Sequence, residues 1–375
     1  MIRFEPRRET RQWYGFVTSL IALGVAAAIS GIVLMFAGHD PLEVYRRVIS
    51  AGFTAPGAFS NTLLSAAPLA FAGLAAGIAF RMQAWNIGGE GQLYLGAIGS
   101  SGIGLVLGSE VPTAVSIAAM IVSGIVAGAL WAAIPAFLRT RMDCNEILTT
   151  LMLNYVAGLL AYYLIFGSYS HWRDQTSPAG KLYPEGKILD PSTFWPGIPV
   201  GDVIVPFGFA LVLFAALALQ ILLHSTSFGF NVRVVGSSPL SGKYAGMNTN
   251  AVFIVVMLLS GALAGLGGAT LVGDFAHQLD PKALPQSAYG YTGIVAAALA
   301  RYNPPATVLS AILLGALANA GFVLQGPGFP LGLVGTMQGI ILFCVLAAEY
   351  FERYRIRIRQ PNAVHAEHGA SQPTK

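Results

Sequence analysis

An uncharged apolar run followed by a glycine-rich turn occupies residues 59–92, FSNTLLSAAPLAFAGLAAGIAFRMQAWNIGGEGQ. The first 22 of these residues carry no charge, and about 20 consecutive apolar residues cross the hydrocarbon core of a bilayer as a helix. Arg81 and Trp85 follow, as is typical of the membrane–water interface. The turn NIGGEGQ (86–92) then leads directly into a second apolar run. The stretch therefore predicts two membrane-spanning helices joined by a tight turn.

The composition of the whole chain agrees with this prediction. Of its 375 residues, 55% are apolar and only 10% are charged, with a mean hydropathy of +0.64. Soluble globular proteins carry about 25% charged residues, so a soluble enzyme, a nucleic-acid-binding protein and a disordered chain are excluded. The 44 glycines suit close helix packing in lipid. We predict an all-α polytopic membrane protein that lies in the lipid bilayer and has no nucleic-acid partner.

Residues 14–350 contain ten apolar runs, which predict a transmembrane domain of about ten helices. The eighth run is the weakest, because it is short and interrupted by glycines. A cytoplasmic N-terminal segment (1–13) precedes this domain, and a basic cytoplasmic tail (351–375) follows it. The ten runs are residues 14–37, 59–80, 92–109, 112–138, 146–168, 202–223, 250–272, 286–300, 306–324 and 331–350.

The distribution of basic residues predicts the orientation, because Lys and Arg concentrate on the cytoplasmic side. With ten helices and the N-terminus inside, 15 of the 21 basic residues lie on the inner side and six on the outer side. Both termini are then cytoplasmic. Removing any one helix would put the basic C-terminal stretch on the wrong side. The six outer residues are Arg46, Arg47, Arg173, Lys181, Lys187 and Lys282.

Two loops between the predicted helices are long. The outer loop (169–201) is rich in proline, glycine and aromatic residues, and we expect it to form an ordered extracytoplasmic cap. The inner loop (224–248), HSTSFGFNVRVVGSSPLSGKYAGMN, is polar and long enough for one or two short helices. Helices two to five would start outside and helices seven to ten inside, which is the opposite sense that an inverted repeat requires. The two halves share no clear residue identity, so the repeat is a hypothesis.

Polar residues at membrane depth are few, and they mark candidate functional positions because they are costly there. No apolar run carries a series of Asp, Glu or His that could relay protons, which argues against an ion-coupled transporter or a channel. Within NIGGEGQ (86–92), Glu90 falls in the first turn of the third helix, where the positive end of the helix dipole stabilises a carboxylate. Either this segment is only a capped turn, or Glu90 lies near an inner gate.

Further polar residues complete a predicted substrate pathway. A lone asparagine in a spanning helix either bonds to a neighbouring helix or contacts substrate, and this choice is open for Asn154 and Asn319. The eighth run ends abruptly at RYNPP (301–305), which suits either a broken helix that lines a cavity or a short span with interfacial tyrosines. The predicted pathway residues are Asn86, Glu90, Gln92, Asn154, Tyr155, Tyr291 and Asn319.

No site for ATP, a metal or a cofactor is expected. The segment GSSPLSGKY (236–244) faintly resembles a phosphate-binding loop, but five residues separate its glycines where the motif needs four. In addition, Tyr244 replaces the Ser or Thr that would hold magnesium. The six histidines show no metal-ligand spacing outside the tail. We therefore predict a protein that is not an enzyme and that receives its energy from elsewhere.

Three blocks of the sequence resemble the permease subunits of bacterial ABC importers for nucleosides and simple sugars, within the wider group of branched-chain amino-acid and ribose permeases. NIGGEGQ (86–92) is the most specific block and favours the nucleoside type. The inner loop is similar around YAGMN (244–248), although Tyr244 stands where alanine is commoner. The third block is YGYTGIVAAALARYNP (289–304), and the resemblance covers about residues 40–350.

The resemblance implies a fold of the type II ABC importer kind and a set of partners. A second permease subunit, identical or paralogous, would complete the membrane part. Two cytoplasmic ATP-binding subunits would supply energy, and an extracytoplasmic solute-binding protein would deliver a nucleoside or simple sugar. The implied location is the bacterial cytoplasmic membrane. An intramembrane enzyme and a secondary transporter with inverted repeats are the rival interpretations. Co-purification of a separate ATPase subunit would distinguish the importer permease from the secondary transporter.

The inner loop is the expected contact with the ATP-binding subunits, because no other predicted inner loop is long enough. Its glycines supply tight turns, and Pro239 suits the first turn of a short coupling helix, which we expect over residues 237–245. Arg233 and Lys243 would either meet the partner or hold the loop at the lipid headgroups. The expected coupling residues are Arg233, Gly236, Ser237, Pro239, Leu240, Lys243 and Gly246.

Overall fold

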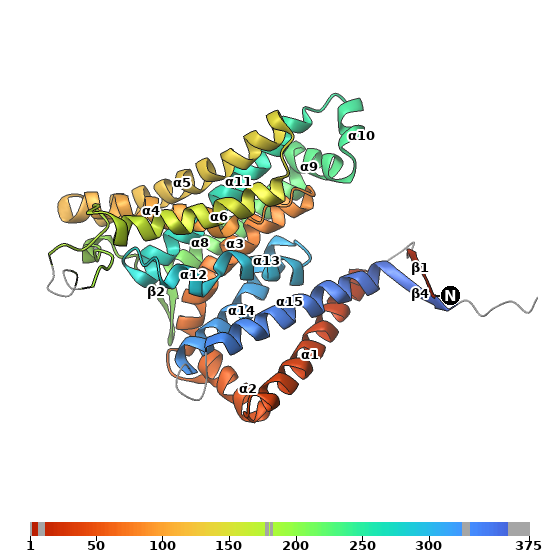
Figure 1. Ribbon diagram of the computed structural model, residues 1–375, viewed down its shortest axis with the longest axis horizontal. Helices are drawn as coiled ribbons and strands as arrows, with labels where there is room; N and C mark the ends of the chain where they lie inside the picture. The colour runs from red at the N-terminus through yellow and green to blue at the C-terminus, as the bar shows by residue number, and fades with distance from the viewer. Residues whose placement is uncertain (1, 7–11, 177–179, 181–182, 325–330, 359–375) are drawn as a thin grey trace, which may run out of the picture.

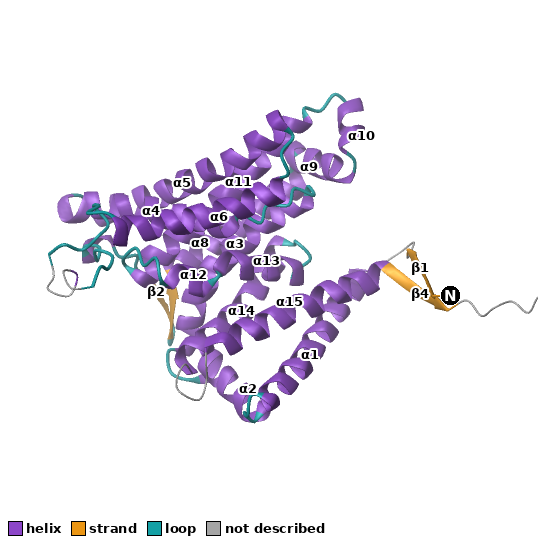
Figure 2. Cartoon of the chain, viewed as in Figure 1, coloured by secondary structure: helices purple, strands orange, loops and turns teal. Residues whose placement is uncertain are grey.

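The computed structural model describes residues 2–6, 12–176, 180, 183–324 and 331–358, and these residues are mostly helical (Figure 2). Within them, a helix occupies each of the ten predicted runs. The helices form an elongated bundle (Figure 1). They are α1 (Gln12–Phe36), α3 (Ala58–Arg81), α4 (Gly89–Leu107), α5 (Thr113–Met142), α6 (Glu146–Tyr162), α8 (Phe207–Ser225), α11 (Thr249–Thr270), α13 (Tyr289–Leu299), α14 (Pro304–Leu324) and α15 (Leu331–Arg353).

Seven of the described helices are long and apolar enough to cross a bilayer. The other three fall short for separate reasons. α4 has 19 residues but begins with Glu90 and Gln92, which lower its hydropathy. α13 has only 11 residues, and the stretch of α15 described in full, Gly335–Ala348, is apolar but shorter than a complete span. The prediction of about ten transmembrane helices is therefore approximately consistent with the structure: seven described helices are full apolar spans, α4 and α13 are not, and α15 is apolar over Gly335–Ala348.

Shorter elements connect the long helices. Helices α6 and α11 end in π-helical turns, and two short strand pairs lie outside the bundle (Figure 2). The short helices are α2 (Pro41–Ile49), α9 (Ser227–Ser237), α10 (Pro239–Tyr244) and α12 (Ala283–Ser287); the π-helical turns are Ser50–Thr54, Tyr163–Gly167 and Leu271–Ala276; the 3-10 turns are Gly108–Glu110 and Pro191–Thr193; the strands are β1 (Ile2–Pro6), β2 (Gly197–Val200), β3 (Val203–Pro206) and β4 (Tyr354–Ile358).

Both strand pairs differ from the sequence prediction. β2 and β3 form an antiparallel hairpin, so the predicted sixth run, which starts at residue 202, becomes helical only from Phe207. The β-branched residues of β3 favour a strand, and Pro206 stands directly before the helix, as its N-cap. β1 pairs with β4 in antiparallel register, from Ile2 opposite Ile358 to Pro6 opposite Tyr354. The two ends of the described chain therefore lie side by side.

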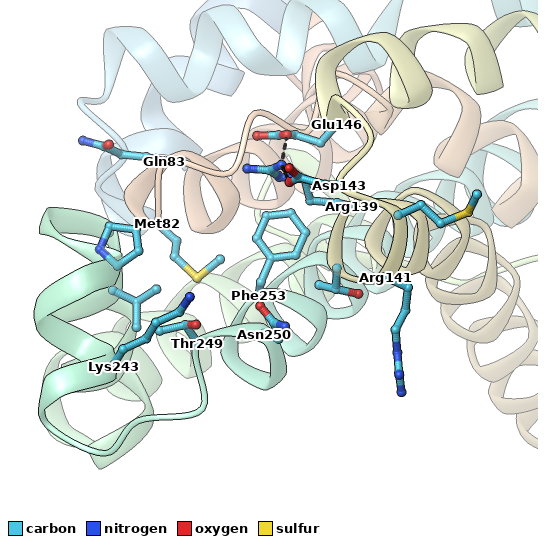
Figure 3. Close-up of a pocket in the computed structure, with 15 residues that line it drawn as sticks. Met82, Gln83, Arg139, Arg141, Asp143, Glu146, Lys243, Thr249, Asn250 and Phe253 are labelled. Atoms are coloured by element: carbon cyan, nitrogen blue, oxygen red, sulfur yellow. Dashed lines mark hydrogen bonds and ion pairs between the residues drawn. The ribbon is translucent and has the colours of Figure 1, made fainter.

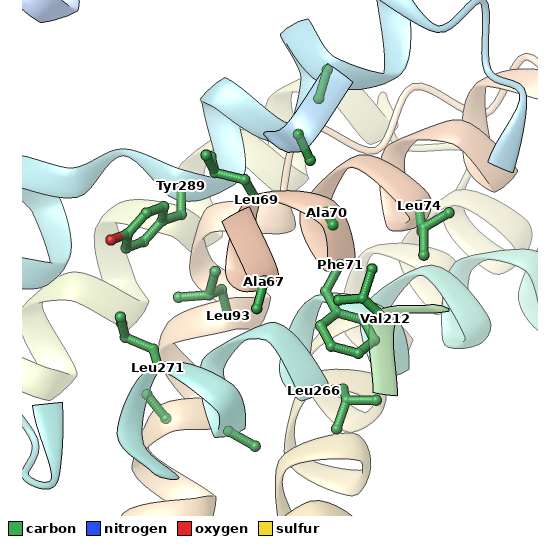
Figure 4. Close-up of a cluster of buried hydrophobic side chains, with 14 of the residues drawn as sticks. Ala67, Leu69, Ala70, Phe71, Leu74, Leu93, Val212, Leu266, Leu271 and Tyr289 are labelled. Carbon is green, nitrogen blue, oxygen red and sulfur yellow. The ribbon is translucent and has the colours of Figure 1, made fainter. Parts of the chain in front are cut away.

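The core of the bundle is centred on α3, in which 89% of the most apolar stretch is buried. Phe71 of α3 is fully buried beside Val212 of α8 and Leu266 of α11 (Figure 4). Glycines allow close helix contacts elsewhere: a Cβ added to Gly265 of α11 would lie 2.2 Å from the carbonyl oxygen of Gly124 in α5. Such small-residue contacts replace the hydrophobic effect as the means of helix association in lipid.

The helix contacts follow the pattern of an inverted repeat. α3 packs against α14 and α13, α11 packs against α5 and α4, and the two central helices α3 and α11 pack against each other. If α3, α4 and α5 of the first half correspond in order to α11, α13 and α14 of the second half, each of these contacts has a counterpart: α3–α14 corresponds to α11–α5, and α3–α13 to α11–α4. Each central helix also follows a short helix, α2 in the first half and α10 in the second. These contacts support the predicted repeat, which residue identity did not reveal.

Candidate functional site

A cluster of polar side chains lies where the first turns of α4 and α13 meet. The residues come from the turn before α4 and from four helices, so segments far apart in the sequence build one site. Five of the seven predicted pathway residues belong to it. We refer to it as the polar cluster, which consists of Asn86, Glu90, Gln92, Tyr94, Asn154, Ser260 and Tyr291.

Glu90 joins two helices through its carboxylate. The backbone N–H of Gly290 donates to Oε2 at 2.6 Å, and the hydroxyl of Tyr94 donates to Oε1 at 2.6 Å. Glu90 is only 3% exposed, so both bonds form away from water. Because Gly290 lies in the first turn of α13, the carboxylate faces the positive ends of two helix dipoles, those of α4 and α13. The helix that Glu90 caps by a hydrogen bond is therefore α13, a partner that the sequence did not indicate.

Asn86 and Gln92 form a second part of the polar cluster. The Asn86 amide donates to Gln92 Oε1 at 3.0 Å and to Ser260 Oγ at 2.9 Å, and it accepts from Gln92 Nε2 at 3.1 Å. Ser260 in turn donates to the carbonyl oxygen of Ala75 in α3 at 2.7 Å. The turn before α4 is thus tied to α11 and α3, and its polar groups are satisfied within the protein, as burial requires.

Asn154 connects α6 to both helix starts. Its Oδ1 accepts from the backbone N–H of Gly91 at 2.9 Å, and its Nδ2 donates to the carbonyl of Ile87 at 2.9 Å and to the hydroxyl of Tyr291 at 3.1 Å. All three partners lie on other elements. Asn154 is 5% exposed and makes the bonds to neighbouring elements that one of its two predicted roles requires.

Two glycines allow close contacts at the start of α4: Gly290 allows contact with the start of α13, and Gly91 allows contact with α6. A Cβ on Gly290 would lie 2.4 Å from the backbone nitrogen of Glu90 and 2.5 Å from its Cα, and a Cβ on Gly91 would lie 2.9 Å from Asn154 Oδ1. Distances below 3.0 Å are not compatible with a real Cβ, so these positions need glycine for space. Gly89, beside them in α4, has nothing within 4 Å of the same point.

Helix α13 is too short to cross the membrane. Eleven residues rise about 16 Å, which is roughly half of a 30 Å hydrocarbon core. Its first turn is fastened by Glu90, and the turn after its end is fastened by Arg81, whose Nε donates to the carbonyl oxygen of Tyr302 at 2.9 Å. The eighth predicted run is therefore a half-helix held at both ends, a length that fits both a broken helix and a short span with interfacial tyrosines.

Two predicted pathway residues do not join the polar cluster by hydrogen bonds. Tyr155 is 67% exposed on the outer face of α6, next to Asn154. Asn319 of α14 is buried elsewhere and donates to the carbonyl oxygens of Ala51 and Ala58 at 3.0 and 3.4 Å. It therefore ties α14 to the segment before α3. Tyr155 and Tyr291, which is 39% exposed, are the predicted pathway residues that reach the surface.

Three polar residues that join helices in the structure were not predicted from the sequence. Tyr94 stands four residues after Glu90, a helical spacing that could have indicated the bond. Ser260 gave no signal, because serine is common in spanning helices. Asp274 lies in the π-helical end of the α11 span and accepts the backbone N–H of Gly208 at 2.8 Å, in the first turn of α8. A second carboxylate thus caps a helix that is remote in sequence.

The inner loop folds as the two short helices α9 and α10. Thr226 and Ser238 cap them, and Pro239 stands in the first turn of α10, as predicted. The coupling helix is shorter than expected, because Ser237 ends α9 and Ala245 lies beyond Tyr244, the last residue of α10. Gly246 has φ +77°, a left-handed conformation that favours glycine after a helix.

The individual coupling residues differ in what they can offer a partner. Leu240 is 62% exposed on α10, and Lys243 is exposed one turn later. Arg233 is also exposed, and in addition it donates to the carbonyl oxygen of Leu223 near the end of α8, which ties α9 to α8. Gly236 is buried against the end of α3, where a Cβ would lie 2.6 Å from the carbonyl oxygen of Arg81. α9 is therefore packed on the bundle, and α10 is presented to the surroundings.

The outer loop packs against the opposite end of α11. The ring of Phe194 stacks on His277 with centroids 3.7 Å apart, and the backbone N–H of Leu189 donates to the carbonyl of His277 at 2.9 Å. Trp195 donates its backbone N–H to Gly273 at 3.1 Å. Burial of its imidazole lowers the pKa of His277 below the ordinary value. The described segment 189–195 of the outer loop thus packs on the end of the α11 span.

Residues 58–346 match the family described as the permease component of the branched-chain amino acid transport system. This match covers the bundle from α3 to α15 and includes both the polar cluster and the inner loop. The chain belongs to this permease family. The resemblance found in the sequence is confirmed, and the permease is the membrane-spanning component of a transport system.

Relatives of the permease extend over most of its length. The glucose ABC transporter permease protein TsgB13 of Haloferax volcanii is 30% identical over 366 residues, which cover 95% of this chain and 94% of that one. The nucleoside ABC transporter permease protein NupB of Lactococcus lactis is 26% identical and covers 95% of each chain. The guanosine ABC transporter permease protein NupP of Bacillus subtilis is 28% identical, covering 89% of this chain and 94% of its own.

Proposed function

We propose that the permease is a subunit of an ATP-driven importer that carries an uncharged nucleoside or simple sugar across the cytoplasmic membrane. Relatives named for glucose, nucleosides and guanosine align with it from end to end. The energy would come from separate cytoplasmic ATP-binding subunits. An extracytoplasmic solute-binding protein and a second permease subunit, identical or paralogous, would complete the importer.

The observation that carries this proposal is the exposure of α10 on a firmly packed base. Leu240 projects from α10, whereas α9 is fixed to the bundle through Gly236 and Arg233. Because α10 is exposed and directly follows the packed helix α9, a partner that moves α10 would also displace the helices of the bundle. This is the mechanical role that a subunit without its own nucleotide site requires.

The polar cluster supports an uncharged substrate. Helix N-termini attract anions, and transporters with broken helices use such ends to hold anionic groups of the substrate. In this permease the carboxylate of Glu90 already faces the first turns of α4 and α13. A phosphate or carboxylate on the substrate would meet that negative charge instead of free N–H groups. The exposed Tyr155 and Tyr291 would contact the substrate. Asn86, Gln92 and Asn154 would hold the helices around these two tyrosines in position.

The orientation follows from the basic residues and the termini. The inner excess of 15 basic residues over six supports a cytoplasmic side for α9, α10 and both ends of the chain. The pairing of β1 with β4 supports the same side for both ends. The outer loop would then face the solute-binding protein, and the helices of the ten predicted runs would lie in the cytoplasmic membrane.

The proposal is tested by a single substitution on α10. Co-expressed with its ATP-binding subunits and binding protein, Leu240→Glu should reach the membrane at the normal level but abolish the increase in ATP hydrolysis caused by the loaded binding protein. Leu240→Met, which keeps an apolar side chain of similar size, is the matched control and should keep that increase. Normal stimulation in Leu240→Glu, or a purified permease that transports without any ATP-binding subunit, contradicts the proposal.

A further inference from the structure

A cavity of about 700 Å³ separates α10 from the turn between α5 and α6. Figure 3 shows Lys243 on one side and Arg139, Asp143 and Glu146 on the other, with Phe253 of α11 between them. The end of α3 and the start of α11 complete its walls. The cavity therefore shares α10 with the proposed coupling surface and extends that surface to a second element.

The charged side chains on the two sides of the cavity differ in how they are paired. Arg139 bridges Asp143, the first residue after α5, and Glu146 in the first turn of α6, with 3.2 Å from its Nε to Glu146 Oε2. With Arg141 and Lys243 included, the lining holds three cations and two acids, a net charge of +1. Lys243, on the opposite side, makes no ion pair within the described part of the chain. The cavity keeps a positive charge that its own walls do not match.

We propose that this cavity is a second docking site for the ATP-binding subunit, which inserts an acidic segment beside Lys243. The inference rests on the proposed function, because it needs that subunit to contact α10. Amide and hydroxyl groups of Gln83, Thr249 and Asn250 also line the cavity, and such groups can bond to the backbone of an inserted peptide. An unpaired cation with polar neighbours suits a carboxylate on a protein segment better than an acyl chain.

The site offers a direct mechanical connection to the polar cluster. Arg139 links the end of α5 to Glu146 at the start of α6, and Asn154 lies eight residues further along the same helix. A rise of about 1.5 Å per residue places Asn154 roughly 12 Å from this contact. Because Asn154 bonds to Gly91 and Tyr291, a displacement of α6 by the docked subunit would act on the first turns of α4 and α13.

A native thiol makes the proposal testable in the intact complex. Cys144 lies in the turn between α5 and α6 and is partly exposed, whereas Cys344, the other cysteine, is buried. A maleimide carrying a photoreactive benzophenone should therefore react at Cys144. On illumination of the permease assembled with its ATP-binding subunits in membranes, we expect a covalent adduct with the ATP-binding subunit. Cys144→Ser should abolish it.

A second probe separates this inference from the proposed function. Leu240→Cys in the Cys144→Ser background places the same reagent on α10. Adducts from both positions support a docking surface that includes the cavity. An adduct from position 240 alone overturns the inference and leaves the proposed function standing, whereas no adduct from either position contradicts both. Capture of lipid alone from Cys144 also overturns the inference.

The charge of the cavity provides an independent readout. Lys243→Glu should weaken binding of the ATP-binding subunit about tenfold or more, and Lys243→Gln should weaken it less. The affinity of the unmodified permease should fall as salt rises, since added ions screen exposed charges. Lys187→Glu in the outer loop is the matched control and should leave binding unchanged. If Lys243→Glu and the unmodified permease bind the ATP-binding subunit with equal affinity, the proposal of an acidic partner segment is wrong.

Discussion

The backbone N–H of Gly290 donates to Glu90 Oε2 at 2.6 Å, across 200 residues of sequence. This bond fastens the start of a half-helix to the start of a long helix within the bundle. It also brings one carboxylate to the positive ends of both helices. In an inverted repeat, α4 and α13 are equivalent elements, so the contact lies where the two halves of the permease meet. A change in the relative position of the halves would have to stretch or break it.

Replacing Glu90 separates the effect of its charge from that of its hydrogen bonds. Glu90→Gln can still accept from Gly290 and can donate to the hydroxyl of Tyr94, so the folded protein should lose only about 0.3–1 kcal/mol from the helix dipoles. Glu90→Ala leaves the N–H of Gly290 buried without a partner, which costs about 1–3 kcal/mol more. Thermal unfolding of the purified permease in detergent measures the difference, and equal stability of the two variants contradicts the capping role.

Adding one methyl group at Gly290 should force the two helix starts apart. The new Cβ would meet backbone atoms of Glu90 at 2.4 and 2.5 Å, and overpacking of this kind costs about 1–3 kcal/mol. Gly89→Ala is the matched control, since nothing lies within 4 Å of its Cβ position. We expect a lower unfolding temperature and reduced uptake for Gly290→Ala only. If both variants behave alike, the helix starts are not in tight contact.

Tyr155 and Asn319 should respond differently to truncation, although the sequence suggested the pathway for both. Tyr155 is exposed on α6, so Tyr155→Ala should raise the KM for uptake without lowering the unfolding temperature. Asn319 bonds to Ala51 and Ala58, and Asn319→Ala should lower the unfolding temperature while leaving the KM nearly unchanged. Uptake kinetics and thermal unfolding, measured on the same preparations, show whether each residue contacts substrate or stabilises the fold. The opposite pattern would remove Tyr155 from the pathway and place Asn319 in it.

The predicted orientation can be examined with cysteines at exposed loop positions in a Cys144→Ser background. Lys187→Cys in the outer loop should react with a membrane-impermeant maleimide added to intact cells. Ser237→Cys beside α10 should react only after the cells are opened. Both positions are exposed in the structure, so access depends on the side of the membrane. Labelling of position 237 in sealed cells contradicts the cytoplasmic placement of the inner loop.

The sequence predicted the features that depend on local composition. Runs of apolar residues have a length that a bilayer defines, so each predicted span contains a helix, and the weak eighth run was recognised as short. Glu90 was placed in the first turn of its helix because the motif NIGGEGQ (86–92) sits directly before an apolar run. Pro239 and the glycines of the inner loop similarly indicated a short helix.

Features that depend on contacts between remote segments escaped prediction. No local pattern shows that Glu90 reaches Gly290 or that Asp274 reaches Gly208, because such pairs depend on how the helices are packed. The β1–β4 and β2–β3 pairs were missed because short strands next to apolar runs resemble the ends of spanning helices. No local pattern shows that the exposed Arg233 also bonds to the carbonyl oxygen of Leu223, because that contact depends on its position beside the end of α8.

Uptake by proteoliposomes tests the central claim most directly. The permease is reconstituted with its ATP-binding subunits, the loaded solute-binding protein is added outside, and entry of a radiolabelled nucleoside or simple sugar is followed with and without ATP inside. The account predicts accumulation only when ATP, the ATP-binding subunits and the binding protein are all present, and no response to an imposed proton or sodium gradient. Accumulation driven by such a gradient, with the permease alone in the membrane, would contradict it.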